Sequence, residues 1–209
     1  MIRNLIWDLD GTLLDTYPAM TEAFVTALAD LGQAVDPTRV DSLARQSLGY
    51  CAEVLGDETG VSPEAIADRF AEHYSATPLA QQPPFPGIVE VCRCIVTHGG
   101  MNAIITHRGR ESAWRLLREH RLDTYFADIL GHEDGYPRKP DPAVFIAMVQ
   151  KHQLKPEETL AIGDREIDIL AGKAAGLQTC LFGSAEGGAT PDLVITDFMQ
   201  LHEILLAQE

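Results

Sequence analysis

The sequence predicts an α/β protein in which an open parallel sheet is interrupted near its start by a block of helices. Short apolar runs that fit strands alternate with helical patterns from residue 88 onward, which is typical of βαβ units. Residues 16–84 show only helical patterns. A proline-rich stretch, residues 81–87, separates this block from the alternating part and indicates a hinge.

The first predicted strand, Ile2–Trp7, organises the rest of the chain. It is short, rich in large apolar residues and bounded by turn residues, as expected of a buried strand. Asp8 and Asp10 follow at its carboxyl end, and Gly11 allows a sharp turn there because it lacks a Cβ atom. The reactive crevice of an open α/β sheet lies at the carboxyl ends of its strands, so we expect both carboxylates to face that crevice.

The inserted block is expected to be wholly helical. Gly32 fits the end of its first helix. Ser62 and Pro63 fit the start of its last helix, as the N-cap and the first helical residue. The predicted helices are Ala19–Leu31, Asp36–Ser47, Cys51–Thr59 and one that begins after Ser62.

Beyond the hinge, the pattern predicts strands that are joined by helices. The first strand is expected to join the same sheet, so residues 1–15 and 85–209 would form a core domain, with residues 16–84 as a helical cap domain over its crevice. The predicted strands are Met101–Thr106, Phe126–Leu130, Thr159–Gly163, Leu177–Phe182 and Leu193–Ile195. The predicted helices are Ile88–His98, Arg110–His120, Pro142–Gln153, Ile167–Ala175 and Phe198–Leu206.

Composition and charge narrow the classes of function. The net charge of −15 argues against nucleic acid or an anionic membrane as the partner, although a local group of cations can still bind a small anionic substrate. The start of the chain lacks a signal-peptide pattern, and no run of 18 apolar residues occurs. The four cysteines lack metal-ligand spacing. We therefore expect a soluble, cytoplasmic protein with reduced thiols.

Asp8 and Asp10 form the first constellation that carries chemistry. Two carboxylates this close stay ionised only if a cation lies between them, and oxygen ligands suit Mg²⁺. A carboxylate beside a metal can also accept a phosphoryl group as an aspartyl-phosphate. The alternative is a strand end with two turn aspartates, because aspartate favours turns.

Polar residues follow two further predicted strands. Thr106 ends the second strand, where its hydroxyl and the following N–H groups could bind an anion or simply cap a helix. His107 and Arg108 either face the substrate or form a solvated loop pair. Lys139, the first lysine of the chain, lies in a loop before a helix. There it either neutralises a phosphate and its attacking carboxylate or is a surface lysine.

The fourth constellation follows the strand Thr159–Gly163. Asp164 and Asp168 are four residues apart, which places them on one face of a helix start. Asp164 would be a third carboxylate for the cation, and Asp168 is better placed to anchor Lys139 or its loop. Their alternative role is to complement the dipole in the first turn of the helix.

Taken in order, these four strand ends resemble the motifs of the haloacid dehalogenase (HAD) superfamily. Asp8–Leu13 resembles its first motif, Thr106 its second, Lys139 its third and Gly163–Asp168 its fourth, and the resemblance covers the whole chain. It implies a Rossmann-like parallel-sheet core with an all-helical cap inserted after the first motif. Such a cap is similar to that of the subfamily that includes phosphoglycolate phosphatase and β-phosphoglucomutase.

The resemblance implies that the chain is a phosphoric monoester hydrolase. Asp8 would be the nucleophile, and Asp10 the general acid and base. Mg²⁺ would be held by Asp8, by Asp10 through its backbone carbonyl and by Asp164. Thr106 and Lys139 would bind the phosphoryl oxygens, and the helical cap would close and exclude bulk water.

The implied substrate is a small phosphorylated metabolite similar to phosphoglycolate. A sugar-phosphate mutase is the alternative, disfavoured because no histidine follows the first motif closely and the inserted block contains no lysine. His107 stands where asparagine often follows the threonine in the phosphatases, which leaves phosphoglycolate itself open. A non-catalytic HAD-fold binding protein is the remote alternative, but it would be expected to have lost a motif side chain.

The cap offers further candidates for substrate binding. Arg45 is the one we expect to contact substrate together with His107, and Arg39 and Arg69 are weaker candidates. Each arginine is otherwise a solvated helix residue. The leucine, valine and phenylalanine side chains of the cap helices supply either a homodimer interface or only the core of the cap.

Overall fold

The computed structural model describes residues 1–184 and 188–208. The chain divides into two compact units, each described by itself. The core unit comprises Met1–Leu14 and the chain from Pro84 onward, and the helical unit comprises Asp15–Pro83. These boundaries lie one residue before those predicted from the sequence.

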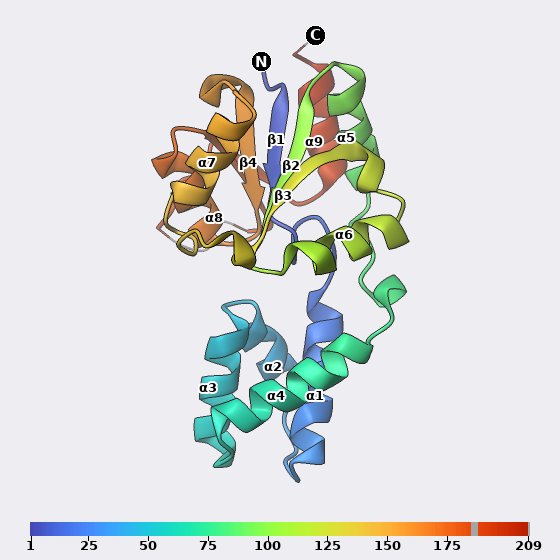
Figure 1. Cartoon of the computed structure of the whole chain (residues 1–209), viewed down its shortest axis with the longest axis vertical. Coiled ribbons are helices and arrows are strands. Elements are labelled where there is room, and N and C mark those ends of the chain that lie inside the picture. The colour runs from blue at the N-terminus through green and yellow to red at the C-terminus, as the bar shows by residue number, and fades with distance from the viewer. Residues whose placement is uncertain (185–187, 209) are drawn as a thin grey trace. The chain divides into compact units, whose positions relative to one another are not determined.

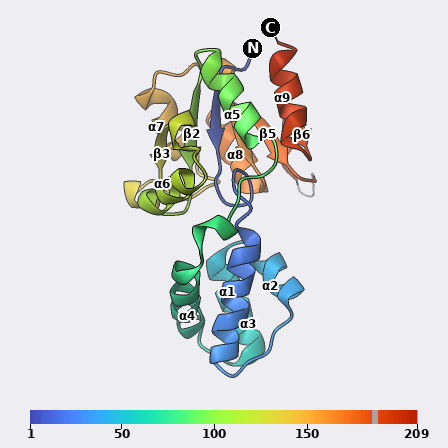
Figure 2. The same cartoon turned by 90° about the vertical axis from the view of Figure 1, so that its right-hand side faces the viewer.

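The core unit is built on a parallel six-stranded sheet in the order β3-β2-β1-β4-β5-β6. Strands β1 to β4 are labelled in Figure 1, and β5 and β6 in Figure 2. The chain runs outward from β1 through β2 to β3 and then crosses to β4 on the other side of β1. The strand order therefore reverses between β1 and β4, where ligands bind in open α/β sheets. The strands are β1 (Asn4–Trp7), β2 (Met101–Ile105), β3 (Phe126–Leu130), β4 (Thr159–Gly163), β5 (Gln178–Phe182) and β6 (Leu193–Ile195).

Helices cover both faces of this sheet (Figures 1 and 2). α7 and α8 pack on the face that includes Ile6, and α5 and α9 pack against each other on the opposite face. On that second face Trp7 lies 5.6 Å from Phe198 of α9, measured between ring centroids. The helices are α5 (Ile88–Thr97), α6 (Arg110–Glu119), α7 (Ala143–Lys151), α8 (Glu166–Ala174) and α9 (Phe198–Leu206). Single turns of 3₁₀ helix occur at Asp123–Tyr125, His132–Asp134 and Pro156–Glu158.

The helical unit has its own apolar core. Phe24 and Phe70 stack with their ring centroids 4.0 Å apart, and Phe70 stacks on Tyr74 at 5.2 Å. The apolar side chains of these helices therefore form the core of the unit. The helices are α1 (Tyr17–Asp30), α2 (Pro37–Ala44), α3 (Leu48–Thr59) and α4 (Pro63–Ala76), followed by a 3₁₀ turn at Leu79–Gln81.

Helix caps explain which helix boundaries of the helical unit match the boundaries predicted from the sequence and which do not. Ser62 accepts a hydrogen bond from the Ala65 N–H at 3.2 Å, as the N-cap expected for α4. The prediction that a helix ends at Ser47 is wrong. Ser47 is instead the N-cap of α3 and accepts from the Tyr50 N–H at 3.0 Å, so α2 ends at Ala44 and α3 begins at Leu48.

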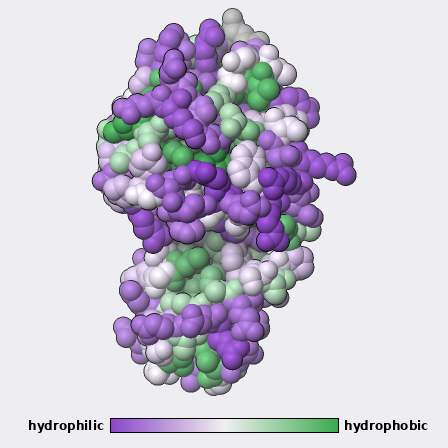
Figure 3. Space-filling model, viewed as in Figure 1, coloured by the Kyte–Doolittle hydropathy of each residue, from purple (hydrophilic) through white to green (hydrophobic). Residues whose placement is uncertain are grey.

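The two ends of the insertion meet. Within the core unit Leu14 forms an antiparallel bridge with Pro84, and within the helical unit the Asp15 N–H donates to the Pro83 carbonyl at 2.8 Å. On the face seen in Figure 3, hydrophilic residues cover much of the surface and hydrophobic residues appear in scattered areas. None of the helices in the described ranges has the length and apolar character needed to cross a bilayer. The predicted α/β class with a parallel sheet is confirmed.

Candidate active site at the carboxyl edge of the sheet

Strand register brings three predicted site residues to one edge of the sheet. Trp7 pairs with Ile104 of β2 and with Ile162 of β4. Asp8 follows Trp7 directly, while Thr106 and Asp164 lie two residues beyond those partners. These three side chains therefore project from neighbouring strand ends at the point where the strand order reverses.

The turn after β1 places a threonine against the third carboxylate. Gly11 has a φ of 80°, a left-handed conformation that favours glycine, and its N–H donates to the Leu14 carbonyl at 2.9 Å. This turn buries Thr12, whose hydroxyl donates to Asp164 Oδ1 at 3.2 Å. The first and fourth motif segments are thus joined directly by a hydrogen bond.

Lys139 lies between two buried carboxylates. Its Nζ donates to Asp8 Oδ1 at 2.5 Å, to Asp168 Oδ1 at 2.6 Å and to the Ile105 carbonyl at 3.1 Å. The three charged side chains are 1–3% exposed. Burial lowers the pKa of Lys139, but Asp168 and Asp8 outweigh it and raise the pKa above its usual value, so the ammonium is firmly charged. Burial raises the pKa of Asp8, against the lowering effect of Lys139.

Asp168 supports Lys139, and both of its oxygens accept hydrogen bonds. Its Oδ1 accepts from Lys139, and its Oδ2 accepts from the Arg165 N–H at 3.2 Å. Gly163 makes this position accessible, because a Cβ atom there would overlap the Asp168 side chain. The glycine of the fourth motif is therefore required for packing.

Carboxylate oxygens of Asp8, Asp164 and Asp168 lie within 4.8 Å of one another, a grouping that could hold a metal ion. Asp8 Oδ2 is buried and has no hydrogen-bond partner among the described residues. A buried carboxylate oxygen in that condition is costly unless a cation or another donor meets it. Asp168 is bonded through both oxygens, to the Lys139 ammonium and to a backbone N–H, whereas Asp8 keeps an orphan oxygen. Asp8, with the nearby Asp164, therefore fits a divalent cation better than Asp168 does.

His107 holds the backbone of the Lys139 loop. Its Nε2 accepts from the Lys139 N–H at 3.3 Å, which places the ring proton on Nδ1. Burial, with Lys139 and Arg138 nearby, lowers the pKa of His107 to about 4, so the ring is neutral near pH 7. His107 also lines a pocket of about 350 Å³ with Thr106, Tyr136 and Arg138.

Asp10 is held by Arg108 and is not one of the three carboxylates whose oxygens lie within 4.8 Å of one another. Arg108 Nη2 donates to Asp10 Oδ1 at 2.6 Å, and its Nε donates to Oδ2 at 3.3 Å. The Arg108 side chain is only 11% exposed. Arg108 is therefore not a solvated loop residue, and neither is His107, which is half-buried.

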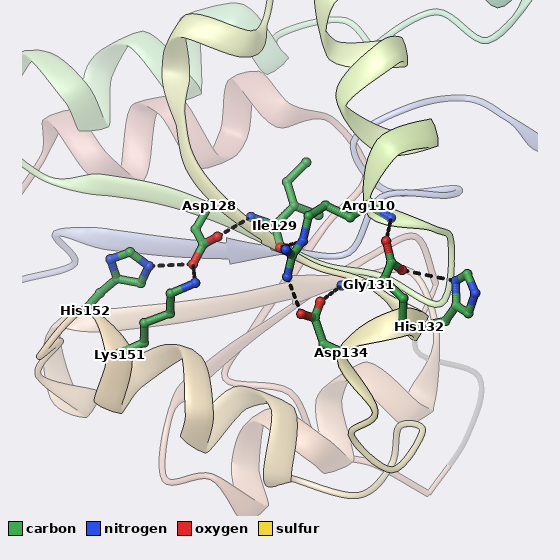
Figure 4. Close-up of polar contacts among 9 residues, drawn as sticks. Arg110, Asp128, Ile129, Gly131, His132, Asp134, Lys151 and His152 are labelled. Carbon is green, nitrogen blue, oxygen red and sulfur yellow. Dashed lines mark hydrogen bonds and ion pairs between the residues drawn. The ribbon is translucent and has the colours of Figure 1, made fainter.

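Arg110 ties the loop after β2 to the loop after β3 (Figure 4). Its N–H donates to Glu133 Oε1 at 2.7 Å, its Nε donates to the Ile129 carbonyl at 3.0 Å, and its guanidinium pairs with Asp134. Asp134 also accepts from the Gly131 N–H at 2.8 Å. These bonds fix the start of the 131–139 loop, which ends at Lys139.

The arginines predicted to meet substrate lie in the helical unit and have partners there. Arg45 pairs with Asp41 at 2.7 Å and lies over the Tyr17 ring, with its guanidinium carbon 4.3 Å from the ring centroid. Arg39 pairs with Glu58 at 2.6 Å, and Arg69 pairs with Glu72 at 2.7 Å. All three side chains are about half exposed.

The structure places Thr12, Arg108 and Arg110 in this network, although the sequence predicted no role for Thr12 or Arg110 and left the role of Arg108 open. Thr12 bonds Asp164, Arg108 bonds Asp10, and Arg110 links two loops. Their proximity to motif residues was the available signal, since Thr12 lies within the first motif and Arg108 follows Thr106 by two positions. Which partner each would meet is decided by long-range packing.

Comparison with known proteins gives consistent matches. The model of the haloacid dehalogenase-like hydrolase family matches residues 5–182. Phosphoglycolate phosphatase of Photobacterium profundum is 30% identical, with 98% of this chain and 96% of that protein covered. Phosphoglycolate phosphatase 1 of Pseudomonas aeruginosa is also 30% identical, with 84% and 67% covered. The crystal structure of a hydrolase from Streptococcus pneumoniae TIGR4 is similar with a TM-score of 0.69 and 30% identity, covering 98% of each chain.

Proposed function

Because the chain belongs to the haloacid dehalogenase-like hydrolase family, we propose that it is a Mg²⁺-dependent phosphatase that acts on a small phosphorylated metabolite through an aspartyl-phosphate. The observation that carries this proposal is the condition of Asp8. It is buried, one oxygen is bonded by Lys139, and the other has no hydrogen-bond partner among the described residues. A carboxylate oxygen in this condition suits both a cation and attack on phosphorus.

In this proposal Asp8 is the nucleophile and Asp10 is the general acid and base. An Asp8 oxygen forms a bond to phosphorus as the bond to the leaving oxygen breaks, and Asp10, protonated once substrate is bound, gives its proton to that oxygen. Asp10 then takes a proton from water as the water oxygen bonds to the phosphorus of the aspartyl-phosphate and the bond from phosphorus to the Asp8 oxygen breaks. Inorganic phosphate leaves, and both carboxyl groups return to their starting state.

Asp8, Asp164 and the backbone carbonyl of Asp10 would hold Mg²⁺. The ion would offset the repulsion between an anionic nucleophile and an anionic phosphate. Two observations support this assignment: Asp8 Oδ2 has no hydrogen-bond partner among the described residues, and the Asp164 carboxylate lies close to Asp8. Both residues offer the oxygen ligands that Mg²⁺ prefers.

Thr106 and Lys139 would bind the transferring phosphoryl oxygens, where positioning and charge supply most of the catalysis. Lys139 already reaches Asp8 with full charge, so it can neutralise both the carboxylate and the incoming phosphate. Asp168 and His107 hold Lys139 from opposite ends, at its ammonium and at its backbone N–H.

We propose a phosphoglycolate-like substrate because the two phosphoglycolate phosphatases named above are each 30% identical to this chain and match 84% and 98% of it. Residues 16–84 would serve as the cap, with Arg45 as a substrate contact. For His107, the hydrogen bond from the Lys139 N–H favours a role in holding the Lys139 loop over a role as a substrate contact. We also propose a cytoplasmic setting, which suits the buried free thiols of all four cysteines.

The test is phosphate release from a panel of small esters that includes phosphoglycolate, sugar phosphates and nucleotides. Each ester is assayed with Mg²⁺, with EDTA and with Asp8→Asn. Asp57→Asn, an exposed aspartate of α3, is the matched control. We expect Mg²⁺-dependent turnover that Asp8→Asn abolishes and Asp57→Asn retains.

Two outcomes would contradict the proposal. Asp8-dependent labelling by a sugar bisphosphate, with glucose 6-phosphate formation and no hydrolysis, would indicate the mutase. Absence of both reactions from the folded, Mg²⁺-loaded protein would indicate a non-catalytic binding protein.

A further inference from the structure

The ion pair between Arg108 and Asp10 occupies the carboxylate that the proposed reaction needs. Arg108 donates to both oxygens of Asp10, at 2.6 Å and 3.3 Å. A guanidinium fork matches a carboxylate in this two-point manner, so the contact is specific in geometry. While this ion pair persists, both Asp10 oxygens accept hydrogen bonds from Arg108, so neither is available to a leaving group alone.

The protein holds the guanidinium in this place from two sides. Arg108 Nη1 donates to the Ser112 hydroxyl on α6 at 3.3 Å. The Arg108 N–H donates to the Thr106 hydroxyl at 3.0 Å, so the backbone of the arginine is fixed next to a proposed phosphoryl ligand. The cation therefore belongs to the carboxyl edge of the sheet and is not a mobile surface group.

Its position predicts what it meets when substrate binds. A general acid must lie within about 3 Å of the oxygen that it protonates. Arg108 contacts the same carboxylate, so it lies beside the leaving group of any ester that Asp10 serves. An anionic group within a few bonds of the ester oxygen would then come within reach of the guanidinium.

We propose that Arg108 exchanges its partner, from Asp10 to a second anionic group on the substrate, and thereby selects small phosphate esters whose leaving group carries a carboxylate. The inference rests on the proposed function and adds the residue that sets its specificity. Binding such a substrate supplies Arg108 with a new carboxylate and frees Asp10 to face the leaving oxygen. An ester without the second anion leaves the Arg108–Asp10 pair in place.

The experiment compares two esters of nearly equal size. Phosphoglycolate carries the carboxylate, and 2-hydroxyethyl phosphate replaces it with an uncharged hydroxymethyl group. Hydrogen bonds to charged groups are worth enough for a preference of about 100-fold in kcat/KM. We expect that preference in the wild-type enzyme with Mg²⁺.

Variants of Arg108 test whether this side chain causes the preference for phosphoglycolate over 2-hydroxyethyl phosphate. Arg108→Gln should reduce the ratio to about one, with phosphoglycolate turnover falling and 2-hydroxyethyl phosphate turnover rising because Asp10 is released. Arg108→Lys keeps the charge without the fork, so its ratio should fall to about 10. Arg118→Gln removes an exposed arginine from α6, the helix that follows Arg108, and should leave the turnover of both esters unchanged.

A binding measurement separates this inference from the proposed chemistry. In the Asp8→Asn background, Arg108→Gln should weaken phosphoglycolate binding by about 100-fold in calorimetry and leave 2-hydroxyethyl phosphate binding unaltered. Equal turnover of the two esters by the wild type would overturn the inference while the phosphatase function stands. An equal loss for both esters in Arg108→Gln and in Arg108→Lys would also overturn it. If no ester is hydrolysed, the function fails, and the binding preference alone decides the role of Arg108.

Discussion

Replacing Lys139 with methionine should destabilise the core unit far more than an ordinary lysine substitution. The ammonium contacts two carboxylates, and all three side chains are at most 3% exposed. Lys139→Met keeps the apolar stem but leaves Asp8 and Asp168 buried without their common cation. Removing one partner from a buried ion pair costs about 3–5 kcal/mol in the free energy of unfolding.

The loss can be measured by urea unfolding in EDTA. With a urea dependence of about 2 kcal/mol per molar, the midpoint should fall by about 1.5–2.5 M. Both tryptophans of the chain, Trp7 and Trp114, lie in the core unit, so their fluorescence reports the unit that contains Lys139.

Two further variants make the reasoning refutable. Lys155→Met is the control, because Lys155 is exposed and pairs with Glu158 at 3.2 Å, a contact worth no more than about 1 kcal/mol. Lys139→Met combined with Asp168→Asn removes one stranded carboxylate and should regain part of the lost stability. If Lys139→Met shifts the urea midpoint no more than Lys155→Met, the ammonium does not stabilise the two carboxylates. The same conclusion follows if adding Asp168→Asn lowers the stability of Lys139→Met further.

Three other outcomes follow from the same structure. His107→Ala should lower kcat by about tenfold with a smaller change in KM, because the Lys139 N–H loses its acceptor. His107→Asn supplies another acceptor and should restore most of kcat. Equal losses of kcat in both variants would contradict this role. Although burial opposes it, hydrogen bonds from Lys151 and His152 lower the pKa of Asp128. Its contribution to stability is therefore present above the unfolded pKa of about 3.9 and lost as pH falls through the lower folded pKa. The stability difference between wild type and Asp128→Asn should shrink below about pH 4 in urea titrations, and a constant difference would refute the assignment. Burial also raises the pKa of the Cys51, Cys92 and Cys180 thiols, and Cys94 is buried as well. The native protein should therefore resist a thiol reagent that labels all four after unfolding, and fast native labelling would show that the thiols are accessible.

The sheet was predictable because its strands are local apolar runs. β3, β4 and β6 begin and end at the predicted residues, and α9 does as well. The 3₁₀ turns were not predicted, because a single turn is too short to show periodicity. The helix boundary at Ser47 was missed because a serine can end one helix or cap the next, and only the hydrogen bond to Tyr50 decides which.

The candidate site was predictable as a set of residues and less so as a set of contacts. Strand ends gather at one edge of a parallel sheet, so the sequence order placed Asp8, Thr106 and Asp164 together. The partner of Arg108 could not be read in the same way, because Asp10 lies 98 positions away and the contact depends on the path of two loops. Specific side-chain pairs of this kind require the folded chain.

The meeting of the insertion's two ends has a consequence for how the protein forms during synthesis. β1 must pair with β2 and β4, whose residues leave the ribosome long after it, as the Asn4–Met101 and Asn4–Thr159 pairings show. The intervening helices have mostly local contacts and their own core, so they can fold while the sheet still lacks its partners. With Asp15 bonded to Pro83, that folded block would shorten the effective loop between β1 and β2 and lower the entropic cost of closing it. The insertion would then assist assembly of the central sheet before any substrate is present.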